Sequence, residues 1–380
     1  MSEWRKVTIG ELVTLRQGFA INAKSKHYIS KEQTSLALLR IADMKSGSKE
    51  IFVKEDIPQN FIAKPQDIIY TRTGNVGLVF RNNYGVVHNN CFTVTPNDEW
   101  ILSRDFLYYL LQSQYFFEKA NSLARGAAQP DLPHSLFNSI EISYPSLQVQ
   151  NKIATILSRY DSLIENYQKQ IKLLEESAQR LYKEWFIDLR FPGHENTKIV
   201  DGVPEGWEKK KVGDLISKVV RTKQVSANNY LNSGCIPVID QSRNYIAGYT
   251  NDIECLVEVT TPYIVFGDHT RVLKYVPFSF AKGADGTQII MSNDLERMPQ
   301  SLFYNSLIEI DLSNYSYARH FKYLKEESIL VPSKAIAQKY DKVVSQYFQS
   351  IQKSRGQIRH LTEARDRLLP KLMSGEIEVF

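Results

Sequence analysis

The segment that decides the fold occurs twice in the sequence. It reads WRKVTIGEL at residues 4–12 and WEKKKVGDL at residues 207–215, an offset of 207 − 4 = 203 residues. A later pair, ISYPS at residues 142–146 and ILVPS at residues 329–333, has an offset of 329 − 142 = 187 residues. Self-similarity of this kind indicates an internal repeat. The chain is therefore predicted to be a duplication whose second globular part is shorter by 203 − 187 = 16 residues.

Each copy ends in a long helical pattern. QIKLLEE at residues 170–176 matches QIRHLTE at residues 357–363, again at an offset of 187. Apolar or small residues recur at helical spacing in both copies and form one stripe on each helix. About 40 residues at about 1.5 Å each predict a helix of roughly 60 Å. The stripe consists of Val149, Ile153, Ile156, Tyr160, Leu163, Tyr167, Ile171, Leu174, Ala178, Leu181 and Trp185, and in the second copy of Tyr340, Val344, Tyr347, Ile351, Ile358, Leu361, Leu368 and Leu372.

A single apolar stripe has to be buried against another surface. The two helices are each other's natural partner, so we predict that they form an antiparallel coiled coil. Two successive steps of four residues, at Tyr167 and Ile171, break the strict heptad and relax the supercoil locally. The antiparallel arrangement would place the two globular domains at opposite ends of the helices, related by an approximate twofold axis.

The globular halves combine short strands with short helices, which predicts the α+β class. Between the helix ending near Leu189 and Trp207, the segment RFPGHENTKIVDGVPEG is rich in Pro, Gly and polar residues and marks a boundary. Strands are predicted at 66–70, 76–80, 263–266 and 271–276, and short helices at 104–112 and 300–307. The predicted divisions are a first globular domain at 1–147, a central helical spacer at 148–191, a linker at 192–206, a second globular domain at 207–333 and a C-terminal helical spacer at 334–380.

Composition sets the class of protein and of partner. Of 380 residues, 43% are hydrophobic and 23% charged, as in ordinary globular proteins. The 47 Lys and Arg exceed the 42 Asp and Glu, and this mild excess permits a polyanionic partner without proving one. Cys91, Cys235 and Cys255 form no CxxC pair, which favours a reducing compartment. No signal-peptide pattern opens the sequence, and no apolar run approaches the roughly 18 residues of a membrane span, so we expect a cytoplasmic protein.

The sequence carries no familiar catalytic motif. There is no P-loop, GxGxxG, HExxH or zinc spacing, and no Asn/Asp-Pro-Pro-aromatic motif of amino-methyltransferases, so no S-adenosylmethionine or ATP site is predicted. His88 and Cys91 have a ligand-like spacing but lack further ligands, and we interpret them as core residues. Asp201 and Glu208-Lys209-Lys210 follow the order of a nuclease site, but lie across a loop and a strand start, which favours a solvated linker.

Four polar loops remain as candidate sites, at residues 70–75, 125–131, 267–271 and 282–288. They hold Arg, Gln and Asn, the residue types that read guanine and adenine in the major groove. For each single residue a solvated turn is the alternative, because Gly, Asp, Asn and Thr are also what turns require. Lys209, Lys210 and Lys211 fit either phosphate contacts or a solvated strand edge.

With these motifs in order, the chain resembles the specificity subunit of a type I restriction-modification enzyme over essentially its whole length. The resemblance rests on the Trp-x5-Gly-[Glu/Asp]-Leu start of each half, on WFID at 185–188 continuing to PEGW at 204–207, and on LTEARDRLLPKL at 361–372 followed by SGEI at 374–377. One departure lies a few residues after Pro145 and Pro332, the prolines of ISYPS and ILVPS. Many relatives have Glu-Gln there, whereas this chain has Val149-Gln150 and Ala337-Gln338.

The resemblance implies a non-catalytic DNA reader. Each globular half would be a target recognition domain for one half of a bipartite double-stranded DNA sequence. The helices would set the gap and dock two methyltransferase subunits. S-adenosylmethionine, ATP and Mg would be carried by these and by the restriction subunits, with no cofactor in this chain.

The resemblance also extends to the loops. FGDHTR at 266–271, GADG at 283–286 and YARHF at 317–321 look like a recurring recognition-domain subtype, and Gly126 and Gln129 follow the commoner pattern. The expected DNA contacts are Thr71, Arg72, Thr73, Asn75, Arg125, Gln129, His269, Thr270, Arg271, Lys274, Lys282, Asp285, Thr287 and Arg319.

Two other classes of function remain open. A protein-interaction scaffold would use the 11% of aromatic residues as interface anchors and would show no salt-dependent affinity for DNA. A self-sufficient DNA-modifying enzyme is less favoured, because the chain lacks a cofactor motif.

Overall fold

A computed structural model describes residues 4–219, 221–315 and 319–379. Tyr317 and Ala318, part of the closing element expected by resemblance, lie outside the described residues. The chain forms two compact units, Met1–Glu165 with Arg359–Phe380, and Asn166–Ile358. Each unit includes a part of both long helices, α5 (Leu147–Tyr182) and α8 (Lys334–Met373). The domain boundaries drawn from the sequence, which separate globular from helical segments, stay a prediction.

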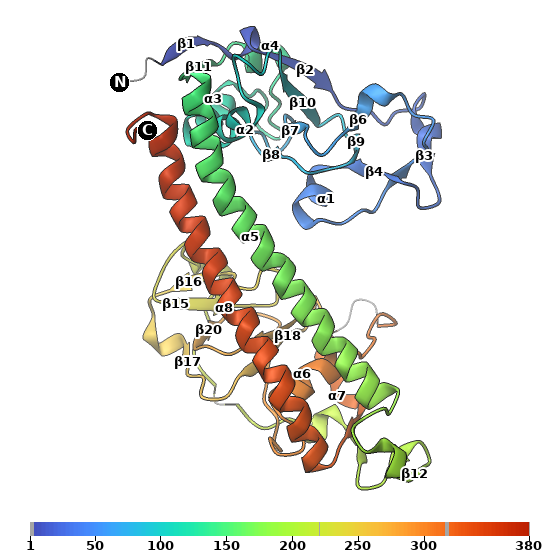
Figure 1. Ribbon diagram of the computed structural model, residues 1–380. Coiled ribbons are helices and arrows are strands. Elements are labelled where there is room, and N and C mark those ends of the chain that lie inside the picture. The colour runs from blue at the N-terminus through green and yellow to red at the C-terminus, as the bar shows by residue number, and fades with distance from the viewer. Residues whose placement is uncertain (1–3, 220, 316–318, 380) are drawn as a thin grey trace. The chain divides into compact units, whose positions relative to one another are not determined.

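The first unit contains two sheets and a strand pair (Figure 1). One sheet has the order β2-β10-β7-β8, the other has the order β3-β5-β4-β9-β6, and β1 pairs with β11. The strands are β1 (Arg5–Thr8), β2 (Val13–Gln17), β3 (Ile29–Ser30), β4 (Leu36–Leu39), β5 (Phe52–Val53), β6 (Ile62–Ala63), β7 (Ile68–Thr71), β8 (Val79–Phe80), β9 (Gly85–Val87), β10 (Cys91–Pro96) and β11 (Glu141–Tyr144). The short helices are α1 (Ile41–Ser46), α2 (Arg104–Gln112), α3 (Gln114–Leu123) and α4 (His134–Asn138).

The second unit repeats this plan. Its sheets have the orders β16-β15-β20-β17 and β19-β18-β21, and β14 pairs with β22. The strands are β12 (Ile199–Val200), β13 (Val203–Pro204), β14 (Glu208–Lys211), β15 (Ile236–Ile239), β16 (Gly248–Thr250), β17 (Leu256–Val257), β18 (Tyr263–Gly267), β19 (Leu273–Val276), β20 (Phe280–Lys282), β21 (Thr287–Ile290) and β22 (Ser328–Val331). The short helices are α6 (Gln300–Ile308) and α7 (His320–Glu326).

Strand pairing confirms the duplication residue by residue. Arg5 pairs with Tyr144 in the first unit, and Glu208 pairs with Val331 in the second, at the expected offsets of 208 − 5 = 203 and 331 − 144 = 187. The central strands add a third offset, because the Ile68–Val94 pair corresponds to the Ile264–Ile290 pair at 264 − 68 = 290 − 94 = 196. The 16-residue shortening is therefore split into 203 − 196 = 7 residues before β18 and 196 − 187 = 9 residues before β22.

The glycine of the repeated start motif has a packing reason. A Cβ at Gly10 would lie 2.6 Å from the Cβ of Asn138, at the end of α4. A Cβ at Gly213 would lie 3.1 Å from the carbonyl oxygen of Lys325, in α7. A side chain is therefore excluded at Gly10 unless its surroundings shift, and would be tightly packed at Gly213, where the first turn of each copy meets the helix before its last strand.

The predicted elements are largely confirmed, and the α+β class is confirmed. The predicted helices 104–112 and 300–307 correspond to α2 and α6. The predicted strand 76–80 is confined to β8, because Gly77 has a φ of +97° and belongs to the preceding turn. The predicted strand 271–276 begins only at Leu273, because Arg271 has a φ of +61° and also lies in a turn.

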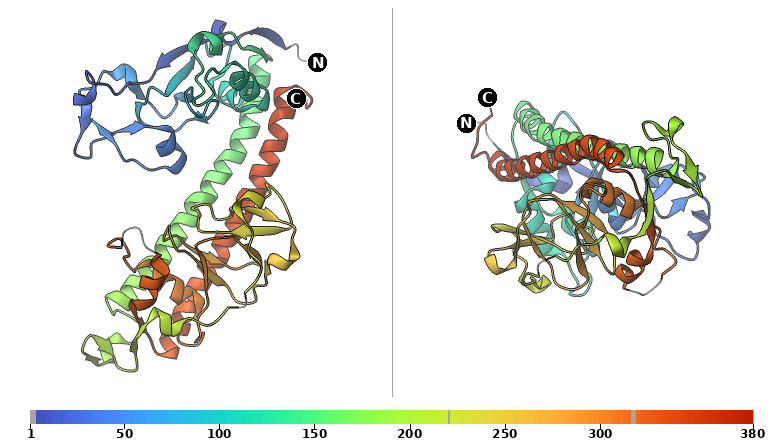
Figure 2. Two further views of the ribbon diagram at one scale, coloured as in Figure 1. Left: turned by 180° about the vertical axis from the view of Figure 1, so that it is seen from behind. Right: turned by 90° about the horizontal axis from the view of Figure 1, so that it is seen from below.

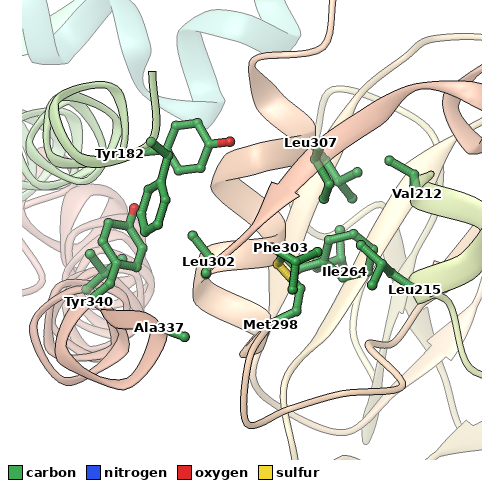
Figure 3. Close-up of a cluster of buried hydrophobic side chains, with 14 of the residues drawn as sticks. Tyr182, Val212, Leu215, Ile264, Met298, Leu302, Phe303, Leu307, Ala337 and Tyr340 are labelled. Carbon is green, nitrogen blue, oxygen red and sulfur yellow. The ribbon is translucent and has the colours of Figure 1, made fainter. Parts of the chain in front are cut away.

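The long helices run antiparallel within each unit (Figures 1 and 2). In the second unit, the Tyr340 hydroxyl donates to the carbonyl oxygen of Ala178 at 3.2 Å, and Arg355 donates to Glu175 at 3.0 Å, so the numbering rises along α8 as it falls along α5. Figure 3 shows Tyr182 of α5 beside Tyr340 of α8 at the edge of that unit's core. The antiparallel helix pair is confirmed, whereas the placement of the globular parts at opposite ends of it stays a prediction.

In the part of the chain that the structure describes, no helix is both long enough and apolar enough to cross a bilayer.

Candidate nucleic-acid interface

A polar hollow of about 480 Å³ in the second unit collects several of the residues selected from the sequence. We call it the polar basin. It lies where the loop after β18, the loop before β21 and the start of α7 meet, so its lining comes from segments far apart in the chain. The basin is lined by Gln224, Asp268, His269, Lys282, Asp285, Gly286, Thr287, Gln288 and Arg319. Five of these, His269, Lys282, Asp285, Thr287 and Arg319, are among the expected DNA contacts.

The basin is electropositive on one side. Lys282 also lines a neighbouring hollow together with Arg221, Gln224 and Gln288. Burial lowers the pKa of Lys282, and the nearby positive charge of Arg221 lowers it further. A cation held beside another cation in a half-buried position is stabilised by an incoming anion such as a phosphate. Arg319 and His269 are exposed side chains of the basin lining.

Two of the expected contacts are used inside the protein instead. The Lys274 amine is only 4% exposed and donates to the carbonyl oxygens of Asp240 at 2.8 Å and Asn244 at 2.5 Å. Burial lowers its pKa to about 8. The Thr71 hydroxyl is fully buried, donates to the carbonyl oxygen of Asn75 and accepts from the backbone N–H of Leu78 at 2.9 Å. Sequence reasoning missed their burial, and both side chains hold turns rather than face a ligand.

Two of the remaining expected contacts of the second unit, Thr270 and Arg271, lie in the loop after β18, and a third, Thr287, begins β21. Thr270 donates its hydroxyl proton to the carbonyl oxygen of Gln241 at 2.5 Å. Arg271 is exposed but donates from Nη1 to the carbonyl oxygen of Leu312 at 3.1 Å. Thr287 lines the basin although it is only 2% exposed, and its hydroxyl has no partner among the described residues.

In the first unit, an ion pair joins the two selected loops. Arg72 donates from Nε and Nη2 to both carboxylate oxygens of Asp131, at 3.0 and 2.6 Å, and from Nη1 to the Gln17 amide oxygen at 3.0 Å. Thr73 donates its hydroxyl proton to the same carboxylate at 2.5 Å. The Arg72 guanidinium, helped by Thr73, holds the pKa of Asp131 below its usual value. Arg72 and Thr73 are therefore occupied within the protein.

Three selected side chains of the first unit stay exposed, namely Asn75, Arg125 and Gln129. Arg125 and Asp131 exchange backbone hydrogen bonds at 2.8 Å in both directions, which closes the loop that carries Gln129. The structure thus brings these residues to the place where the β7–β8 turn meets the segment before α4.

The two sites share one backbone plan with different side chains. Arg72 donates its backbone N–H to the carbonyl oxygen of Asn90 at 2.8 Å, and Asp268 donates to that of Gly286 at 2.6 Å, both at the offset of 268 − 72 = 286 − 90 = 196. Asp268 is buried, and its carboxylate accepts from the backbone N–H of Phe321 at 2.8 Å at the start of α7. Equivalent positions that carry a cation in one copy and an anion in the other favour different ligand preferences.

Several residues that build the sites were not selected from the sequence. Gln17 is the last residue of β2 and Gln241 comes shortly after the apolar strand β15, and a single amide at a strand end is too common a pattern to single out. Arg221 and Gln224 lie in the irregular segment between Leu215 and β15, and only folding places them beside Lys282. Asp131 and Gln288 belonged to the selected loops, but their residue types alone did not distinguish them from turn residues.

Comparisons with known proteins agree with one another. A family model described as "Type I restriction modification DNA specificity domain" matches residues 1–176. The chain is 29% identical to the type I restriction enzyme MjaIX specificity subunit of Methanocaldococcus jannaschii over 341 residues, which cover 82% of this chain and 78% of that protein. It is 23% identical to the HindI specificity subunit of Haemophilus influenzae over 99% of this chain and 100% of that one.

A solved structure shares the fold. The crystal structure of a type I restriction-modification system S subunit from M. genitalium superposes with a TM-score of 0.62 at 21% sequence identity. The match covers 98% of this chain and 96% of the other. The agreement extends through both units.

Proposed function

Because the chain belongs to the family of type I restriction-modification specificity subunits, we propose that its two units each read one half of a bipartite DNA target. The observation that carries this proposal is the repeated backbone plan, in which Arg72 and Asp268 occupy equivalent positions at the edge of two polar sites. Two similar platforms with different side chains suit a target made of two different half-sites. In this family the chain is the recognition subunit and not the catalytic one.

The proposed DNA contacts are the selected residues whose side chains remain available. In the second unit these are His269, Lys282, Asp285 and Arg319, joined by Arg221, Gln224 and Gln288 of the two adjoining hollows. In the first unit they are Asn75, Arg125 and Gln129. Lys282 and Arg221 suit phosphates, whereas the amides and Arg319 suit base edges.

The partners follow from the same proposal. Two methyltransferase subunits would dock on the helical parts, and restriction subunits would join them, so that S-adenosylmethionine, ATP and Mg reside on those partners. The helices would set the gap between the half-sites. We place the complex in the cytoplasm, where its DNA substrate would lie. A protein-interaction scaffold without DNA has no observation in its favour.

Methylation mapping tests the proposal. Cells that express this chain with its neighbouring methyltransferase subunit are compared, by single-molecule sequencing of their DNA, with cells that express the methyltransferase alone. We expect a bipartite adenine-methylated motif only when this chain is present. Absence of a new motif, with the complex shown to be assembled, would refute the reader role and revive the scaffold.

A further inference from the structure

One amide side chain joins the two loops that form the polar basin. Gln241 follows β15, and its Oε1 accepts from the backbone N–H of His269 at 3.1 Å. Its Nε2 donates to the carbonyl oxygen of Asp285 at 3.2 Å. The first bond ties down the loop after β18, and the second ties down the loop before β21. Together with the backbone hydrogen bond from Asp268 to the carbonyl oxygen of Gly286 at 2.6 Å, this side chain links the two loops.

The surrounding backbone is built to leave room for this side chain. Gly286 has a φ of +66°, and a Cβ there would lie 2.8 Å from both the oxygen and the nitrogen of the Gln241 amide. A Cβ at Gly267 would lie 2.9 Å from the Cβ of Gln241 and 2.2 Å from the Thr270 hydroxyl oxygen. Both contacts are closer than a real Cβ tolerates, so the two glycines and Gln241 form one packed arrangement.

The chemistry of the two bonds requires an amide. An amide offers a donor and an acceptor at one end of the side chain, whereas a carboxylate only accepts and alanine does neither. A carboxylate at this position would also place negative charge against the Asp285 carbonyl oxygen. Gln241 is not among the residues that line the basin, and its amide is already engaged on both sides. Its two bonds therefore couple it to a ligand through the positions of His269 and Asp285.

We propose that Gln241 is a positioning residue for base recognition by the second unit. By joining the loops of His269 and Asp285, it holds these two side chains in the spacing that matches one half-site. This inference rests on the proposed function and adds to it a specificity determinant that does not touch DNA. Because Gln241 belongs to the second unit, a change at this residue should affect recognition of only one of the two half-sites.

The test uses the full chain in complex with its methyltransferase subunit. Gln241→Ala, Gln241→Glu and the wild type are incubated with DNA that carries the mapped target or single-base changes in either half, and methylation of each DNA is measured. Gln241→Glu keeps the size of the side chain, so it remains informative if Gln241→Ala fails to fold. Asn232→Ala, an exposed amide of the same unit outside these loops, is the matched control.

We expect preference for the correct base to fall about tenfold at one half-site, the size expected from losing one or two hydrogen bonds. Preference at the other half-site should not change, and Asn232→Ala should match the wild type at both. An equal loss at both half-sites, or weaker methylation with unchanged base preference, would reduce Gln241 to a structural role and overturn the inference. A wild-type complex without a bipartite target would instead overturn the proposed function itself.

Discussion

Arg365 of α8 donates from Nη1 to Oδ1 of Asp161 of α5 at 2.8 Å, within the first unit. The other oxygen of Asp161 accepts from the Tyr109 hydroxyl at 2.6 Å, and Arg81 approaches it to 3.5 Å. In the second unit Phe348 lies at the position of Asp161, at the helix offset of 348 − 161 = 187. Tyr275 pairs with Ile264, the counterpart of Ile68, and continuing the Ile69–Phe80 register by one residue places Arg81 opposite Ile68, so Tyr275 corresponds to Arg81. The rings of Phe348 and Tyr275 stack with centroids 4.2 Å apart. The junction between recognition fold and helix is thus polar in one copy and aromatic in the other.

Removal of the Asp161 carboxylate should destabilise the first unit. Asp161→Ala leaves Arg81, Arg365 and the Tyr109 hydroxyl without their shared acceptor, and we expect a loss of about 2–4 kcal/mol in the free energy of unfolding. The measurement is urea unfolding, with hydrogen exchange of first-unit amides to assign the loss. Glu176→Ala, which breaks only an exposed pair with Lys172, is the control and should cost no more than about 0.5 kcal/mol.

The aromatic junction should respond differently to salt. Phe348 is 6% exposed, and Phe348→Ala should cost about 3–4 kcal/mol through lost burial and a cavity. Because no charge is removed, we expect this cost to be the same at low and high salt. A cost that shrinks with added salt would show that the stacked rings are not its main source.

The buried amine of Lys274 should make stability depend on pH. Burial lowers its pKa from 10.5 to about 8, so between these values the unfolded chain binds more protons than the folded chain. Stability contributed by this group therefore rises with pH from about 8. Comparing the melting temperatures of wild type and Lys274→Met from pH 7 to pH 10 tests this, and the difference should shift in favour of the wild type as pH rises. A constant difference would contradict the lowered pKa.

Substitutions of Arg319 and Lys282 should have different effects, because we assign Arg319 to base recognition and Lys282 to phosphate binding. For Arg319→Ala we expect a cost of about 1–3 kcal/mol that relaxes one half-site. For Lys282→Ala we expect weaker binding to all sequences and a salt slope smaller by about 1. Titrations of the methyltransferase complex with labelled duplexes at several salt concentrations measure both. Lys198→Ala, an exposed charge remote from the basin residues in sequence, serves as the control and should leave the slope unchanged.

The Arg72–Asp131 pair should hold the two loops of the first unit in place for base recognition, as Gln241 does for the loops of the second unit. Arg72→Lys keeps the positive charge but removes the guanidinium group, which donates hydrogen bonds to both carboxylate oxygens of Asp131 and to the amide oxygen of Gln17. We expect base preference to fall about tenfold at one half-site only, for the loss of charge-assisted hydrogen bonds. This half-site should be the one that Gln241→Glu leaves intact. If both variants relaxed the same half-site, the assignment of one half-site to each unit would be wrong.

The plan of the chain can be read from its sequence alone. The repeats at Trp4 and Trp207 predicted the duplication, and the stripe from Val149 to Trp185 predicted α5. These features are local or periodic, so they can be read without knowing what lies beside them. The same holds for the loop that carries His269 and for the loop that carries Asp285, because turn chemistry and strand ends are written in neighbouring residues.

The role of each polar side chain, by contrast, depends on contacts that form only when the chain folds. Arg72 meets Asp131 across 131 − 72 = 59 residues of chain, and Gln241 meets Asp285 across 285 − 241 = 44. Lys274 is of the same type as Lys282, yet one is buried against Asp240 and the other lines the basin. Residue type sets which bonds a side chain can make, but burial and partner choice depend on segments brought together by folding.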